Sequence, residues 1–102
     1  IEQVRMYAGN CRILLISPIE LGNDVWQDKY DPQFDAGSPA VSRGLKSSFA
    51  KVARKHGTDI LAASDHAKPS NIDCEHLDEN GHNALARAVE DKILSIYGRA
   101  AS

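Results

Sequence analysis

Asp73 and His76 are the residues of this chain whose types and spacing are best suited to catalysis. They lie three positions apart in the stretch IDCEHLDENGH, residues 72–82. A carboxylate at this spacing can turn back and accept a hydrogen bond from one imidazole nitrogen. That bond would fix the tautomer and stabilise the imidazolium that forms when the other nitrogen takes a proton. The pair therefore predicts the orienting acid and the general base of a nucleophilic site.

Two apolar segments predict the strands that position this pair. Residues 12–17 (RILLIS) and 58–64 (TDILAAS) are apolar runs of the kind found in strands buried on both faces of a parallel sheet. The loop that carries the pair follows the second run. In open α/β sheets, ligand sites form at the carboxyl ends of the strands, so the loop is placed correctly for a site.

Two segments with apolar residues at helical spacing predict the helices. The first lies between the strands, with Ser38 as its N-cap and Gly57 as its stop. The second is expected to begin after a cap at Asp78 and to end at Gly98. A strand–helix–strand order predicts a parallel βαβ unit with a right-handed crossover. Two strands leave sheet edges uncovered, so we expect further strands from a missing upstream segment, or pairing with a second copy.

Residues 73–86 (DCEHLDENGHNALA) resemble the last conserved block of the SGNH hydrolases, also called GDSL esterases and lipases. In that family a D-x-x-H-L segment precedes a short turn, Gly-His and an Ala/Leu-rich C-terminal helix. The likeness extends upstream through the strand ending at Ser17-Pro18, and it covers nearly the whole chain. It implies a three-layer α/β/α, flavodoxin-like fold, with residues 1–102 forming the C-terminal part of a single hydrolase domain.

The same resemblance implies roles for three residues. Asp73 would be the orienting acid, His76 the general base, and His82 a structural residue at the start of the last helix. The family's nucleophile lies in a G-D-S segment and its oxyanion donors in two middle blocks, none of which occurs in this chain. We therefore expect a C-terminal fragment of a serine esterase or lipase that needs the missing N-terminal half, no cofactor and no metal.

The loop between residues 19 and 37 is the candidate wall of a substrate pocket. It leaves the sheet at the same carboxyl edge, and loops of this length in small domains are usually functional. Val25 and Trp26 are the best candidates to contact a lipid, carbohydrate or other small-molecule ester. The alternative is that these side chains cover the helix layer as ordinary core residues.

Other chemistry-bearing residues fit simpler explanations. A zinc site from Cys74, His76 and His82 lacks the usual ligand spacing. The adjacent Ser64, Asp65 and His66 have diverging side chains and cannot align as a triad. Acidic neighbours disfavour the thiolate of Cys74, so a cysteine nucleophile is not expected.

Charge and composition limit the classes of protein to which the chain could belong. The net charge of -2 and pI of about 6.1 do not indicate nucleic-acid binding, and no apolar run is long enough to span a membrane. Two cysteines in unlike surroundings predict free thiols, which favour a reducing, cytoplasmic location. The competing function is a non-catalytic α/β module that self-associates or binds a partner, with Asp73 and His76 only locking the loop.

Overall fold

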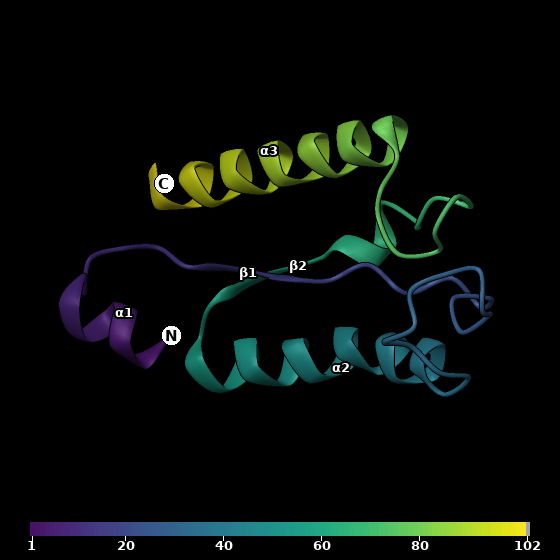
Figure 1. The fold of residues 1–102 in the computed structure, drawn as a ribbon. Coiled ribbons are helices and arrows are strands. Elements are labelled where there is room, and N and C mark those ends of the chain that lie inside the picture. Colours follow the sequence, from purple (N-terminus) through teal and green to yellow (C-terminus); the bar gives the residue numbers. More distant parts are fainter. Residues whose placement is uncertain (102) are drawn as a thin grey trace.

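Two parallel strands form the middle of the structure, a computed structural model that describes residues 1–101 and the side chains of residues 1–98. Strand β1 (Leu14–Ser17) pairs with β2 (Asp59–Ala62), with Leu14 opposite Asp59 and Ser17 opposite Ala62. Arg12 and Asp59 form a salt bridge of 3.1 Å at the start of the pair. Both strands run in the same direction, so their carboxyl ends lie at one end of the molecule (Figure 1).

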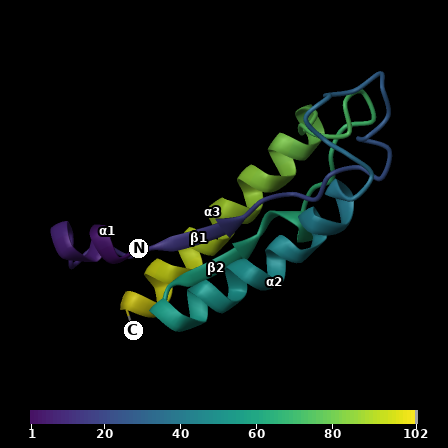
Figure 2. The ribbon, with the colours of Figure 1, turned by 60° about the horizontal axis from the view of Figure 1, so that its bottom comes forward.

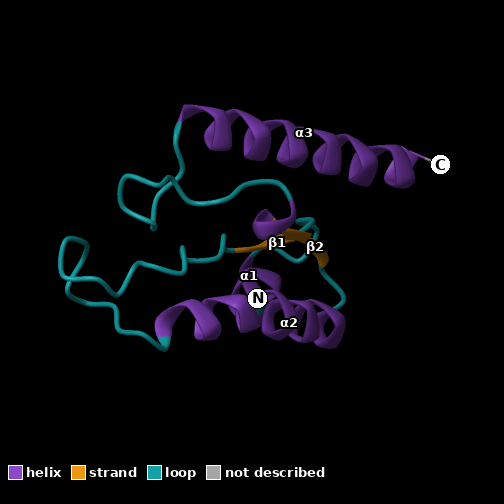
Figure 3. Cartoon of the chain, turned by 90° about the vertical axis from the view of Figure 1, so that its right-hand side faces the viewer, coloured by secondary structure: helices purple, strands orange, loops and turns teal. Residues whose placement is uncertain are grey.

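Helices cover the two faces of this sheet and complete three layers. Helix α2 (Ser38–His56) connects the strands and lies on one face, and α3 (Glu79–Ala101) lies on the other (Figures 1 and 3). The short α1 (Glu2–Tyr7) projects beyond the opposite end from the two long loops (Figure 2). The predicted α/β/α class with parallel strands is therefore confirmed, as part of such a fold.

The strands are shorter and less buried than the sequence predicts. Residues 12 and 13 precede β1, and residues 63–65 form the 3₁₀ helix η1 (Ala63–Asp65) rather than the end of β2. Only Ser17 and Leu61 are buried within the strands, and Ile16 keeps 39% of its surface exposed. The reason is that neither strand has a second neighbour within the part of the chain described.

The sequence predicts the C-terminal end of α2 correctly and its N-terminal cap with an error of one residue. Gly57 ends the helix in the left-handed conformation, with φ of 64° and its N–H directed at the Ala53 carbonyl, as predicted. The predicted N-cap was wrong by one position, because Gly37 occupies the cap and Ser38 is the first helical residue. The Ser38 hydroxyl instead accepts a hydrogen bond of 3.0 Å from the backbone N–H of Asp35.

Helix α3 begins as predicted but ends later. The Asp78 carboxylate accepts a 2.7 Å hydrogen bond from the backbone N–H of Gly81, which is the expected capping contact. The predicted stop at Gly98 was wrong, because the helix continues to Ala101. A glycine inside a helix costs only about 1 kcal/mol, and Gly98 has no positive φ that would end the helix. No helix among residues 1–101 is both long and apolar enough to cross a membrane.

The two long loops meet where Gly22 packs against Cys74. The backbone N–H of Gly22 donates a 2.8 Å hydrogen bond to the Cys74 carbonyl. A Cβ atom added at Gly22 would lie 2.7 Å from the Cys74 Cβ and 3.2 Å from its Cα. Cys74 itself has φ of 58°, a conformation that residues other than glycine rarely adopt. This junction therefore requires a residue without a side chain at position 22.

We predict that Gly22→Ala destabilises the protein by about 1–3 kcal/mol, because the new methyl group overlaps the Cys74 side chain. Gly44→Ala is the matched control, since nothing lies within 4 Å of its added Cβ and it sits inside α2. That control should raise stability by up to about 1 kcal/mol. Denaturant unfolding measures the stability of both variants. Replacing Cys74 with Gly should reduce the free energy of unfolding that Gly22→Ala loses. Equal stability of the Gly22 and Gly44 variants would contradict the junction.

Candidate active site

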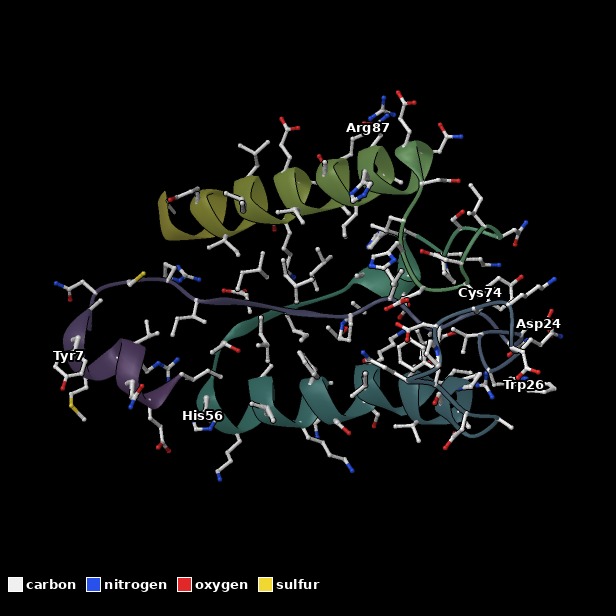
Figure 4. The ribbon with its side chains drawn as sticks, in the orientation of Figure 1. Tyr7, Asp24, Trp26, His56, Cys74 and Arg87 are labelled. Carbon is white, nitrogen blue, oxygen red and sulfur yellow. The ribbon has the colours of Figure 1, made fainter. Side chains whose placement is uncertain are left out.

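The loops after β1 and β2 lie together at the carboxyl end of the sheet. Asp24 and Trp26 of the first loop and Cys74 of the second are drawn at the same end of the molecule, opposite Tyr7 (Figure 4). Asp73 and His76 flank Cys74 in the sequence, so the candidate pair lies at this end too. The placement expected of a ligand site in an open α/β sheet is therefore present.

The predicted bond between Asp73 and His76 is present. The carboxylate oxygen Oδ2 of Asp73 lies 2.6 Å from Nδ1 of His76. With the carboxylate ionised, Nδ1 carries the proton and donates it to this bond. The lone pair of the ring is then on Nε2 in the neutral imidazole. This is the tautomer that a general base needs when it takes a proton at Nε2.

The other oxygen of Asp73 holds the turn in place. Oδ1 accepts hydrogen bonds of 2.9 Å from the backbone N–H groups of both Glu75 and His76. These two bonds, followed by the side-chain bond to His76, lower the pKa of Asp73 from 3.8 to about 2. The stabilisation that these contacts provide is therefore present above pH 3.8 and is lost as the pH falls through about 2.

The environment of His76 favours its protonated form. Its hydrogen bond to Asp73 is the main cause that raises the pKa above 6.5, and the negative charge of Glu75 contributes next. The Glu75 carboxylate lies 3.9 Å from Nδ1. The His76 side chain is 73% exposed, so Nε2 can be reached from outside the chain. The ring is thus oriented from one side and open to a reaction partner on the other.

Backbone hydrogen bonds close the loop that carries this pair. The N–H of Ser70 donates to the His76 carbonyl at 2.7 Å, and the N–H of Cys74 donates to the Ser70 carbonyl at 2.8 Å. The Ser70 hydroxyl accepts a further bond of 3.1 Å from the N–H of Ile72. These bonds fold residues 70–76, here called the His76 segment, onto themselves. The junction between Gly22 and Cys74 attaches this segment to the loop after β1.

This arrangement can accept and release a proton, but within residues 1–98 it places no nucleophile in hydrogen-bonding contact with the ring. No serine or cysteine within residues 1–98 hydrogen-bonds to the His76 ring, whose Nδ1 lies near the carboxylates of Asp73 and Glu75. Ser64, Asp65 and His66 do not form a triad either, because Asp65 pairs with Lys46 of α2 at 2.6 Å. The part of the chain described therefore contains an oriented Asp–His pair with no hydroxyl or thiol hydrogen-bonded to its ring.

Val25 and Trp26 occupy different environments. Val25 has 0% exposed surface, so its side chain belongs to the core. Trp26 is 46% exposed and lies at the loop end of the molecule (Figure 4). Their assignment to a substrate pocket remains a prediction, and Trp26 is the one of the two that a ligand can reach.

The possible metal ligands that lie close together in the structure differ from the zinc ligands considered from the sequence, Cys74, His76 and His82. Asp73, Glu75 and His76 place one possible ligand atom each within 4.8 Å of one another, and neither Cys74 nor His82 belongs to such a group within residues 1–98. Nδ1 of His76 is already hydrogen-bonded to Asp73 at 2.6 Å. A cation held by all three residues would have to break the bond that orients the ring. The geometry therefore suits the hydrogen-bonded pair better than a metal centre.

Sequence reasoning missed Glu75, Ser70 and the contact between Gly22 and Cys74. Glu75 lies at one of the two positions between the candidate catalytic residues for which the Asp–His spacing specifies no residue type. The contribution of Ser70 comes from its backbone groups, which any residue carries. The close approach at Gly22 depends on how two distant loops pack. The one available signal was a glycine in a long loop, which is too common to identify a contact.

Solved structures share this fold over most of the chain. One crystal structure is 31% identical in sequence, with a TM-score of 0.78 over 85% of this chain. Est24, a carbohydrate acetylesterase from Sinorhizobium meliloti, is 24% identical with a TM-score of 0.70 over 83% of the chain. A candidate arylesterase from Agrobacterium tumefaciens str. C58 is 22% identical with a TM-score of 0.67 over 83%.

The chain spans 39% of the length of each of these three proteins. No protein-family model matches the chain, and no curated protein sequence matches it. The comparisons therefore show part of an α/β fold that esterases use, and they leave the chemistry to be argued from the site.

We predict that the imidazole of His76 titrates above 6.5, and that Asp73→Asn lowers its pKa because the main hydrogen bond to the imidazolium is weakened. Proton NMR titration of the ring resonances measures both values. Glu75→Gln is the control and should lower the pKa less, because Glu75 is the second cause and lies 3.9 Å away. A His76 pKa that is the same with and without the Asp73 carboxylate would contradict the assigned bond.

Proposed function

We propose that this chain is the acid–base part of a carboxylic ester hydrolase of the SGNH type, with Asp73 and His76 as its contribution to a catalytic triad. The observation that carries the proposal is the 2.6 Å contact between Oδ2 of Asp73 and Nδ1 of His76, with the ring exposed at the carboxyl end of a parallel sheet. The shared fold with esterases supports the proposal, as does the resemblance of residues 73–86 to the family's last block.

The proposed reaction uses His76 twice. A serine from the rest of the domain attacks the ester carbonyl while Nε2 of His76 takes the hydroxyl proton. The tetrahedral intermediate collapses, Nε2 gives that proton to the departing alkoxide, and an acyl-serine remains. Water then attacks the acyl group while Nε2 takes one of its protons, and returning the proton to the serine releases the carboxylic acid. Asp73 holds the ring and stabilises its charged form throughout.

The surface around α3 supports the interpretation that the remainder of the domain binds along the free edge of β1. One flank of α3 has a groove of about 570 Å³ that is mainly apolar, lined by His82, Leu85, Ala86, Val89, Glu90, Ile93 and Leu94. The other flank, beside Leu61 and His66 on the β2 side, carries Arg87, Asp91 and Lys92. Apolar surface is the surface that further strands and helices would cover. We infer that β1 is the inner strand and β2 the outer one.

In the complete protein, we predict that His76→Ala lowers kcat for a short-chain chromogenic ester at least roughly 100-fold, because the general base is lost. Asp73→Asn should be milder, since the imidazole remains and only its orientation and charge stabilisation suffer. His56→Ala is the matched control and should retain most activity, because His56 is the last residue of α2 and lies at the opposite end of the molecule from Cys74 (Figure 4). Full activity of the His76 variant would refute the proposed role.

A non-catalytic interaction module is the second candidate, and the exposed apolar residues favour it. Ile16, Ile93 and Leu94 are 39%, 40% and 61% exposed, which suits a surface that another chain covers. The two candidates differ in what they require of the rest of the domain. A nucleophilic serine and oxyanion donors directed toward Nε2 belong to the hydrolase, and their absence from the complete protein would favour the module.

A further inference from the structure

A cavity lies beside the loop that carries Asp73 and His76, and Ser70 and Cys74 of that loop line it. It has a volume of about 350 Å³, near the lower limit of the range for small-molecule sites. Neither Asp73 nor His76 lines it. Its walls come from the loop after β1, from α2 and from the segment after β2, so it occupies the crevice at the carboxyl ends of the two strands.

The cavity has a buried apolar floor and a charged rim. Ala67 and Cys74 are 8% and 9% exposed and form its floor. Arg43 of α2 and Lys68 are exposed on its rim. Arg43 donates a 3.0 Å hydrogen bond to the side-chain oxygen of Asn23, a neutral partner. Neither cation forms an ion pair with any residue whose side chain the structure describes. Both positive charges therefore remain available to a ligand.

The other residues that line the cavity limit both the charge and the chemical groups of an anion that could bind there. Glu20 contributes one negative charge, so the charged residues of the lining carry a net charge of one positive unit from two cations and one acid. This balance suits a monoanion better than a phosphate monoester, whose charge at pH 7 is about −1.5 to −2. Asn23, Ser64 and Asn71 add amide and hydroxyl groups that bind hydroxyl groups of a ligand. A planar guanidinium matches a carboxylate in shape.

We propose that this cavity binds a small carboxylate that carries several hydroxyl groups, such as a sugar acid. Arg43 and Lys68 bind the carboxylate, and the amide and hydroxyl side chains bind the hydroxyl groups. The site also contacts the catalytic loop, because Ser70 and Cys74 line the cavity and their backbones attach the His76 segment. A bound ligand therefore holds that segment in place. The binding site itself is independent of the proposed hydrolase activity.

Isothermal titration calorimetry with sodium glucuronate tests the site, with glucose as the neutral analogue and inorganic phosphate as the competing anion. We expect saturable glucuronate binding. Glucose should bind at least about tenfold more weakly because it lacks the carboxylate that pairs with the two cations. Phosphate should also bind at least about tenfold more weakly, because it lacks the sugar hydroxyl groups and its charge exceeds the net charge of the lining. Arg43→Gln and Lys68→Gln should each weaken glucuronate binding at least about tenfold. Lys51→Gln is the matched control, since Lys51 is exposed on α2 and does not line the cavity.

Three results would overturn the proposal: no saturable glucuronate binding to the wild-type protein, equal binding of glucose, or unchanged affinity in both charge variants. Tighter binding of phosphate would reject the carboxylate in favour of a phosphate ligand. Thermal denaturation of each variant confirms that the fold is intact, which the exposure of Arg43 and Lys68 leads us to expect. Because the readout is binding, loss of the hydrolase proposal would leave this result standing.

Discussion

The carboxylate of Asp73 accepts hydrogen bonds from three donors within four residues of sequence, and the site depends on how its two oxygens divide them. Oδ1 receives the backbone N–H groups of Glu75 and His76, which shapes the turn. Oδ2 receives Nδ1 of the His76 ring, which sets the tautomer. One side chain therefore shapes the loop and orients the His76 ring. The same bonds keep the carboxylate ionised, because they lower its pKa to about 2.

This local arrangement works only because distant parts of the chain hold the loop in position. The backbone of Ser70 bonds to His76 and Cys74, and Cys74 in turn bonds to Gly22 in the loop after β1. The positive φ of Cys74 and the missing side chain of Gly22 allow the two loops to approach closely. Parallel strands bring both loops to one end of the sheet. The sheet therefore determines where the His76 ring lies, and the Asp73 turn determines how the ring is oriented.

Much of the fold and of the candidate site could be predicted from the sequence, because these features depend on residues close together in the chain. Apolar runs predicted two parallel strands, Asp78 predicted a helix cap, and the spacing of Asp73 and His76 predicted their hydrogen bond. Features that depend on long-range packing could not be predicted. The start of α2 was misplaced because Gly37 and Ser38 are both acceptable caps. The strands were expected to be more buried because apolar composition does not reveal whether a strand pairs with one neighbour or with two.

The central claim is that His76 acts as the base and that Asp73 sets its basicity. The pH dependence of kcat/KM for ester hydrolysis by the complete protein tests it most directly. A base must be neutral, so the rate should fall as the pH drops through the raised pKa of His76, above 6.5. Replacing Asp73 with Asn should move this acid limb to lower pH. A rate that stays constant while the His76 ring titrates would contradict the account.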